Sequence, residues 1–154
     1  MEKLTINSFD RFDMVNNPGD NKPAFTIWFA GCTVRCKGCH NVGLWNKKNG
    51  TKYAVCDIVN IIESQPVEYN SIVLLGGEPL EQDINELASL CKILRGRGYN
   101  VWLYTSYELD NVPRSILSNI DMIKTGKFDI NRKTNDSLLA SSNQKLYEIQ
   151  HNGG

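Results

Sequence analysis

Short apolar runs recur along the chain. Residues 24–31 (AFTIWFAG) are almost continuously apolar, which is the pattern of a strand buried on both faces. Residues 71–75 (SIVLL) and 100–105 (NVWLYT) show the same pattern. Residues 121–124 predict another strand, and residues 145–149 predict an edge strand near the end of the chain.

Between these runs, apolar residues recur at helical spacing. The pattern predicts a helix over residues 54–64 and a longer helix over residues 81–95, which Gly96 and Gly98 end. Residues 113–119 predict a short helix before the next strand.

The alternation of strands and helices predicts a fold class. Strands separated by helices pair in parallel through right-handed crossovers. A closed barrel of such units needs about 250 residues. We therefore expect an α/β fold with a mostly parallel sheet, arranged as an open, partial (βα) barrel. No repeat or linker divides the sequence, so residues 1–154 are expected to form one domain.

Three chemically unusual segments each follow a predicted strand. They are residues 32–39, residues 76–79 and residues 105–106. The carboxyl ends of parallel strands meet at one edge of a sheet, and ligands bind outside that edge. The sequence therefore predicts that the three segments converge on a single site.

Composition narrows the class of protein. The 154 residues are 41% hydrophobic and 22% charged, as in ordinary soluble domains. With 17 basic and 17 acidic residues the net charge is zero, which disfavours a nucleic-acid binder and leaves association with a protein partner or a second copy open. No apolar run reaches the ~20 residues of a membrane span. The N-terminus lacks the apolar stretch of a secretory signal, so a cytoplasmic location is expected.

Three of the five cysteines form a tight cluster. Cys32, Cys36 and Cys39 follow the pattern Cys-x3-Cys-x2-Cys. Cytosolic cysteines stay reduced, so a cluster of this kind points to metal binding or catalysis. Iron–sulfur cubanes usually take four thiolates, one for each iron. Three local ligands would leave one iron open to a substrate or cofactor.

A structural zinc site is the alternative for this cluster. A structural zinc site takes four ligands, and the fourth would come from a distant residue such as His151, Cys56 or Cys91. Cys56 and Cys91 fall on the apolar faces of predicted helices, where a free cysteine behaves as a small hydrophobe. Both are therefore expected in the core.

The sequence Gly-Gly-Glu-Pro at residues 76–79 follows the strand SIVLL. Gly76 and Gly77 allow a sharp turn and the close approach of a ligand to the backbone. Glu78 adds a carboxylate that favours a cation, and Pro79 stiffens the entry into the next helix.

Together these motifs resemble the radical S-adenosylmethionine superfamily and, within it, the small activating subunit of anaerobic ribonucleotide reductase. Residues 31–41 (GCTVRCKGCHN) are similar to the cysteine segment of that activase. Residues 102–107 (WLYTSY), 121–128 (DMIKTGKF) and 142–146 (SNQKL) are similar to further activase segments, and the resemblance covers residues 12–149.

Four features depart from the activase pattern. Residues 17–20 (NPGD) stand where the family commonly has Gly-Pro-Gly followed by arginine. His40 stands where tyrosine is frequent, Ser106 replaces a glycine, and Thr125 replaces an aspartate. The cluster ligands are unaffected by these departures.

The resemblance implies the following chemistry. A [4Fe–4S] cluster on Cys32, Cys36 and Cys39 binds S-adenosylmethionine at its fourth iron and cleaves it reductively. The resulting 5′-deoxyadenosyl radical removes hydrogen from a glycine of the large reductase subunit. The partners implied are that subunit and an electron donor such as a flavodoxin, while nucleic acid and membrane are not expected partners.

The motifs also imply the cofactor contacts. Gly76, Gly77 and Glu78 would meet the ammonium group of the methionine moiety. Backbone groups beside Cys39 would meet the adenine, and strand-end polar groups would contact the ribose or carboxylate. No catalytic side chain beyond the cluster and cofactor ligands is expected. The remaining candidates for these cofactor contacts are Gly38, His40, Thr105, Ser106 and Asn143.

Three other functions compete with this interpretation. The chain could activate a different glycyl-radical enzyme or act on a small molecule as a radical enzyme. It could be a zinc-stabilised binding module without enzymatic activity. It could also be a degenerate activase that binds its partner without cleaving the cofactor.

Overall fold

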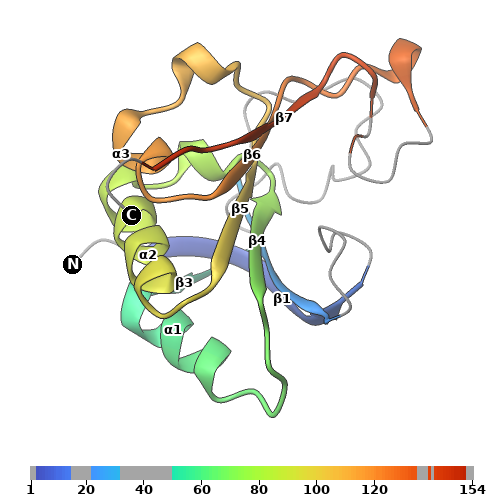
Figure 1. Cartoon of the computed structure of the whole chain (residues 1–154). Coiled ribbons are helices and arrows are strands. Elements are labelled where there is room, and N and C mark those ends of the chain that lie inside the picture. Colours follow the sequence, from blue (N-terminus) through green and yellow to red (C-terminus); the bar gives the residue numbers. More distant parts are fainter. Residues whose placement is uncertain (1–2, 15–21, 32–49, 135–138, 140, 152–154) are drawn as a thin grey trace.

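The computed structural model describes residues 3–14, 22–31, 50–134, 139 and 141–151. These residues form one seven-stranded sheet with helices beside it (Figure 1). The strands are β1 (Leu4–Asp13), β2 (Ala24–Phe29), β3 (Thr51–Tyr53), β4 (Ser71–Gly76), β5 (Asn100–Tyr104), β6 (Met122–Thr125) and β7 (Lys145–Glu148). The α-helices are α1 (Val55–Glu63), α2 (Ile84–Gly96) and α3 (Arg114–Leu117). Short 3-10 turns are η3 (Pro79–Glu81), η4 (Leu109–Asn111) and η5 (Ile130–Arg132).

The strand order is β3-β1-β2-β4-β5-β6-β7. The central strands β2, β4, β5 and β6 pair in parallel, as the alternating pattern predicted. Antiparallel strands extend the sheet on both sides, with β1 and β3 beyond β2 and with β7 beyond β6. The two outermost strands, β3 and β7, do not pair with each other, so the predicted open sheet is confirmed.

Capping residues determine where the long helix α2 begins and ends. Asp83 caps its N-terminus, where the carboxylate accepts a hydrogen bond from the Glu86 N–H. The sequence predicted that this helix begins at residue 81. In the structure Pro79 begins a separate 3-10 turn, and the helix begins at Ile84. Gly98 follows the helix with a φ of 92°, a conformation that glycine adopts without steric cost.

Helix α1 carries Cys56, which the sequence predicted to lie in the core. Its buried residues are Val55, Ile58, Val59 and Ile62, which form one stripe at helical spacing. Cys56 lies beside this stripe and is exposed, so its assignment to the core was wrong. Cys91 of α2 is buried as predicted.

The main hydrophobic core lies on the helix-covered face of the sheet. Ile27, Leu74 and Leu103 of the central strands are fully buried in one cluster with Leu87 and Leu90 of α2. Figure 1 shows α1 and α2 along this side of the sheet. Among the described helices, none combines the length and apolar character that a membrane crossing requires.

The opposite face of the sheet carries a smaller apolar cluster. It consists of buried residues from β2, β4 and β5, with partly buried residues of β6 and β7 around them. Strand side chains alternate between the two faces, which separates this set from the main core. The buried members are Ala24, Val73, Leu75 and Trp102.

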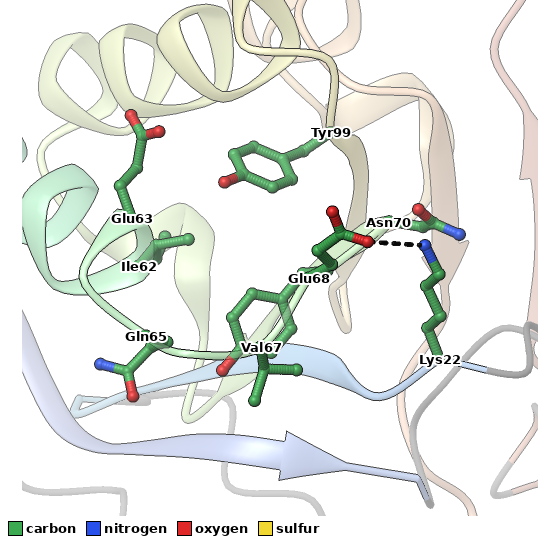
Figure 2. A pocket seen from close by; sticks show the side chains of 9 residues that line it. Lys22, Ile62, Glu63, Gln65, Val67, Glu68, Asn70 and Tyr99 are labelled. Atoms are coloured by element: carbon green, nitrogen blue, oxygen red, sulfur yellow. Dashed lines mark hydrogen bonds and ion pairs between the residues drawn. The ribbon is translucent and has the colours of Figure 1, made fainter.

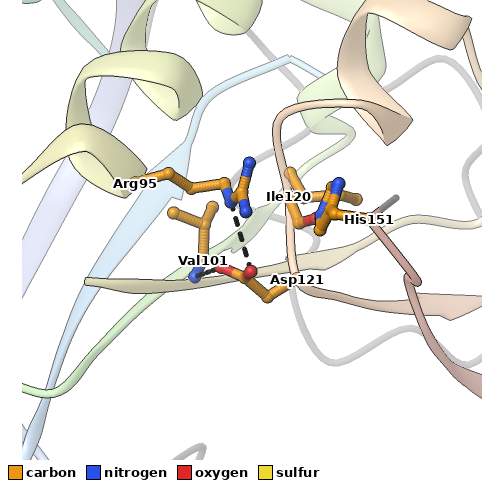
Figure 3. A network of polar contacts seen from close by, with 5 residues as sticks. All are labelled: Arg95, Val101, Ile120, Asp121 and His151. Atoms are coloured by element: carbon orange, nitrogen blue, oxygen red, sulfur yellow. Dashed lines mark hydrogen bonds and ion pairs between the residues drawn. The ribbon is translucent and has the colours of Figure 1, made fainter. Parts of the chain in front are cut away.

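The start of β6 is tied to α2, β5 and the C-terminal segment (Figure 3). The Arg95 guanidinium donates to one oxygen of Asp121 at 3.2 Å, and the Val101 N–H donates to the other at 2.9 Å. A ring nitrogen of His151 lies 2.7 Å from the Ile120 carbonyl oxygen. These contacts hold the amino ends of two parallel strands together, opposite the edge that carries the predicted site.

Candidate functional site

The glycine turn after β4 is fastened to the end of β2. The Gly77 N–H donates to the Phe29 carbonyl at 2.9 Å, and the Glu78 N–H donates to the Gly31 carbonyl at 2.8 Å. Gly76 has a φ of 132°, and a Cβ there would lie 2.4 Å from the Phe29 nitrogen. Glycine is therefore required at 76, and the turn lies directly beside Gly31, the residue that precedes Cys32.

Glu78 links this turn to the end of β5. Its side chain is fully buried, and each carboxylate oxygen accepts two hydrogen bonds. One oxygen accepts from the Leu80 N–H at 3.1 Å and the Thr105 hydroxyl at 2.7 Å. The other accepts from the N–H of Ser106 at 2.8 Å and from the Ser106 hydroxyl. The carboxylate thus fixes two strand ends relative to each other.

Two opposing effects act on the acidity of Glu78. Desolvation by burial raises its pKa, while hydrogen bonds from Ser106, Thr105 and Leu80 favour the charged form and lower it. Desolvation is the larger effect, so the pKa lies above the ordinary value.

The end of β6 joins the same edge of the sheet. The Gly126 N–H donates to the Tyr107 carbonyl at 3.2 Å, which connects β6 to the loop after Ser106. The Gln144 side-chain amide donates to the Gly126 carbonyl at 3.0 Å. The segment that precedes β7 is thereby held against the carboxyl end of β6.

Asn143 has one side-chain atom with a partner and one without. Its Nδ2 donates to the Lys127 carbonyl at 2.9 Å. Its Oδ1 is buried and has no hydrogen-bond partner within the described part of the chain. A buried acceptor without a donor is costly and points to a ligand or water at this position.

The structure confirms the predicted convergence for the residues that it describes. The predicted site residues Glu78, Thr105 and Ser106 form one hydrogen-bonded group at the carboxyl ends of β4 and β5, and Gly76 and Gly77 form the turn that leads into Glu78. Asn143 lies beyond the end of β6 and is linked to this group through the contacts of residues 126 and 107. The predicted ligands and contacts Cys32, Cys36, Gly38, Cys39 and His40 lie outside the described residues.

Sequence reasoning missed Gln82 as a supporting residue. Its side chain accepts from the Thr5 N–H at 2.8 Å and donates to the Ala30 carbonyl at 2.9 Å. It therefore holds β1 and the residues after β2 against the segment that follows the glycine turn. Only its position three residues after Pro79 could have drawn attention to it, because glutamine carries no strong signal of its own.

Two residues on the helix-free face also escaped prediction. Tyr104 of β5 and Lys124 of β6 are register partners near the carboxyl ends of their strands. The Lys124 ammonium lies 4.3 Å from the centroid of the Tyr104 ring, a cation–π contact. A lysine within a short, otherwise mostly apolar strand was the available signal.

Two hollows open on the described surface. One, of about 380 Å³, is lined by Ser106, Tyr107, Glu108, Asn111 and Lys127, and so adjoins the candidate site. The other, of about 320 Å³, lies near the starts of β2, β4 and β5 and includes Lys22, Asn70 and Tyr99 (Figure 2). The second hollow is therefore at the opposite edge of the sheet from the glycine turn.

The residues considered for a fourth zinc ligand are dispersed. Cys91 is buried in the core, and burial raises the pKa of its thiol to about 12, which disfavours the thiolate that binds metal. Cys56 lies on the exposed side of α1. His151 follows β7 and contacts the Ile120 carbonyl.

Comparison with known proteins identifies several relatives. The chain is 29% identical over 148 residues to the anaerobic ribonucleoside-triphosphate reductase-activating protein of Enterobacteria phage T4, covering 91% of this chain and 93% of that protein. It is 28% identical to the protein of the same name from Vibrio cholerae, covering 81% and 84% of the two chains. A pyruvate formate-lyase-activating enzyme from Listeria monocytogenes is 29% identical over 93 residues, which span 56% of this chain and 36% of the enzyme.

The fold also has a solved counterpart. The crystal structure of QueE from Escherichia coli superposes with a TM-score of 0.58 and 21% identity, covering 68% of this chain and 52% of that one. At this level of identity the likeness concerns the fold. Residues 15–147 match the family described as "4Fe-4S single cluster domain", which includes the cysteine segment and the glycine turn. This chain belongs to that family of single-cluster [4Fe–4S] proteins.

Proposed function

We propose that this chain is the activating enzyme of an anaerobic ribonucleotide reductase. In this proposal Cys32, Cys36 and Cys39 hold a [4Fe–4S] cluster that cleaves S-adenosylmethionine and so produces a glycyl radical on the large reductase subunit. The observation that carries the proposal is the hydrogen bond from the Glu78 N–H to the Gly31 carbonyl, which attaches the glycine turn to the start of the cysteine segment. The similarity to activating proteins along nearly their whole length supports it.

When bound, the cluster would supply one electron that cleaves the sulfonium of S-adenosylmethionine into methionine and a 5′-deoxyadenosyl radical. That radical would take a hydrogen atom from the substrate glycine and so become 5′-deoxyadenosine. The chain itself binds and orients. Gly76 and Gly77 offer backbone carbonyls to the methionine ammonium. Glu78, which the resemblance places at the ammonium, is proposed instead to support this turn, because its carboxylate already accepts four hydrogen bonds from protein donors.

Polar groups at the neighbouring strand ends complete the proposed site. The buried Oδ1 of Asn143 is an acceptor suited to a ribose hydroxyl. Thr105 and Ser106 shape the wall beside the glycine turn. Gly38, Cys39 and His40 would present backbone groups to the adenine.

The proposed partners follow from the same assignment. The large reductase subunit is the protein substrate, and an electron donor such as a flavodoxin reduces the cluster. A homodimer of the chain and a cytoplasmic location belong to the proposal as well.

The decisive experiment is anaerobic reconstitution with iron and sulfide, followed by reduction and an assay for 5′-deoxyadenosine. The parent chain should form the product, and Cys36→Ala should not, because one iron loses its thiolate. Product formation by Cys36→Ala at the parent rate would contradict the cluster assignment.

A second assay separates activases from one another. The short match to pyruvate formate-lyase-activating enzymes favours, as the alternative, activation of another glycyl-radical enzyme. Mixing the reduced protein with the large reductase subunit should give the electron-paramagnetic doublet of a glycyl radical. Formation of the doublet only with a formate-lyase would favour the alternative instead.

A further inference from the structure

The helix-free face of the sheet carries a lysine among apolar residues. Lys124 lies between Tyr104 of β5 and Leu146 of β7 in the pairing register. The apolar residues on the same face include the buried Leu75 and the partly buried Met122. The Lys124 ammonium lies over the Tyr104 ring, 4.3 Å from its centroid.

Within the described part of the chain, the ammonium of Lys124 has no anionic partner. Among the described residues no carboxylate lies within ion-pair distance of it, and its recorded contact is the aromatic ring 4.3 Å away. The buried carboxylate of Asp13 accepts a hydrogen bond from the Thr26 hydroxyl at 2.6 Å. Desolvation lowers the pKa of Lys124 to about 8, so burial works against its charge. A partly desolvated cation without an anion is costly, and a bound anion would relieve that cost.

The position of Lys124 places it at the candidate site. It lies at the carboxyl end of β6, two residues before Gly126. Its carbonyl accepts a hydrogen bond from the Thr105 N–H at 2.9 Å, and the Thr105 hydroxyl binds Glu78. Lys124 is therefore connected through Thr105 to Glu78 and the glycine turn.

We propose that the Lys124 ammonium, lying on the Tyr104 ring at this edge of the sheet, is a carboxylate-binding group of the active site. The inference rests on the proposed function, because that function brings the carboxylate of the methionine moiety of S-adenosylmethionine to this edge. An acidic side chain of the protein substrate would present the same chemistry, and the test separates the two sources.

The test measures binding and not turnover. Reconstituted parent and Lys124→Met proteins are compared by equilibrium dialysis with S-adenosylmethionine and with its decarboxylated analogue. Loss of a charge-assisted hydrogen bond should weaken S-adenosylmethionine binding by about tenfold or more. Binding of the decarboxylated analogue should change by less than about twofold, because the group that Lys124 recognises is missing. Thermal unfolding of the variant confirms that it is folded.

Two control variants, Lys92→Met and Lys124→Arg, and a binding measurement with the large reductase subunit complete the experiment. Lys92→Met removes an exposed lysine of α2 and should leave all affinities unchanged. Lys124→Arg keeps the charge and should restore part of the affinity. Affinity for the large reductase subunit, measured without S-adenosylmethionine, reports the second source of carboxylate: a loss confined to this measurement in Lys124→Met assigns the carboxylate to the protein substrate.

The outcomes separate the inference from the function on which it rests. Failure of the parent chain to bind S-adenosylmethionine would remove the proposed function, and the subunit measurement would then decide the role of Lys124 by itself. Affinities of Lys124→Met that equal those of Lys92→Met for every ligand would overturn the inference. Equal weakening toward S-adenosylmethionine and its decarboxylated analogue would overturn it as well.

Discussion

The carboxylate of Glu78 receives four hydrogen bonds in a fully buried position. Glu78→Gln would place an amide NH2 where protein donors already point. We expect a loss of about 1–3 kcal/mol in the free energy of unfolding, because at least one buried donor is left without an acceptor. Urea unfolding of the two proteins measures this difference.

The matched control for this substitution is Glu108→Gln. Glu108 is an exposed glutamate in the loop after Ser106, and the same change there should alter stability by less than about 0.5 kcal/mol. Equal stabilities for the two variants would mean that the Glu78 carboxylate does not hold the strand ends together.

Ser106 shows how a departure from the family pattern is accommodated. The resemblance placed glycine at this position, and the sequence gives no reason for the exchange. In the structure both the N–H and the hydroxyl of Ser106 donate to Glu78. The side chain therefore adds a hydrogen bond to the group around the turn, a contact that depends on β4 and β5 being neighbours and is invisible in the local sequence.

Lys124 should give the protein a distinctive pH dependence. Its pKa is about 8 in the folded chain against 10.5 as the ordinary value. Between these values the unfolded chain binds more protons than the folded one, so stability should rise with pH. Lys124→Met should therefore be more stable than the parent at pH 7, and this advantage should shrink as the pH rises from about 8 toward 10.5.

The other titratable groups on this face do not contribute to the difference in stability between the parent and Lys124→Met over this pH range. Burial raises the pKa of Tyr104 to about 12, beyond the range tested, and the carboxylates of Asp13 and Glu148 are common to both proteins. Chemical unfolding at several pH values measures the difference. A stability difference that stays constant from pH 7 to about 10.5 would show that Lys124 is fully solvated.

At the scale of elements, the parallel centre of the sheet and the antiparallel edge strand β7 were predictable, whereas the antiparallel strands β1 and β3 were not. The runs at residues 24–31 and 71–75 identify buried strands by apolar content alone. β1 (Leu4–Asp13) has mixed burial and two register shifts against β2, so it lacks a clean alternating pattern. β3 (Thr51–Tyr53) has three residues, too few for any periodicity.

The approach of β4 to β2 depends on one glycine. In Gly76→Ala the positive φ alone would cost about 1–3 kcal/mol. The new Cβ would also meet the Phe29 backbone at 2.4 Å and push the two strand ends apart. We expect a lower unfolding midpoint and a weaker affinity for S-adenosylmethionine, both measurable on the reconstituted protein.

Gly96→Ala is the control for this element. A Cβ at Gly96, the last residue of α2, meets nothing within 4 Å. This variant should be unchanged or more stable by up to about 1 kcal/mol. If the two alanine variants behaved alike, close packing of β4 on β2 would not explain the glycine turn.

At the scale of the whole molecule, the residues that form the hydrophobic core are different from the cysteines proposed to bind the cluster. The main core is built from strands and helices between Leu4 and Ile123, and every central strand contributes buried aliphatic side chains to it. The site could be located from sequence because topology brings loops after parallel strands to one edge. Its internal contacts could not, because they join residues as far apart as Glu78 and Ser106.

This separation leads to a prediction for the triple variant with Cys32, Cys36 and Cys39 replaced by alanine. Because the core lies in the sheet and helices, the variant should keep the circular dichroism spectrum and unfolding midpoint of the iron-free parent. After anaerobic reconstitution the parent should hold about four irons per chain, whereas the variant should hold none. Cys56→Ala, which removes an exposed thiol of α1, should load iron like the parent. An unfolded triple variant would show that the cysteine segment is part of the structural core, and iron binding by a folded one would place the cluster on other ligands.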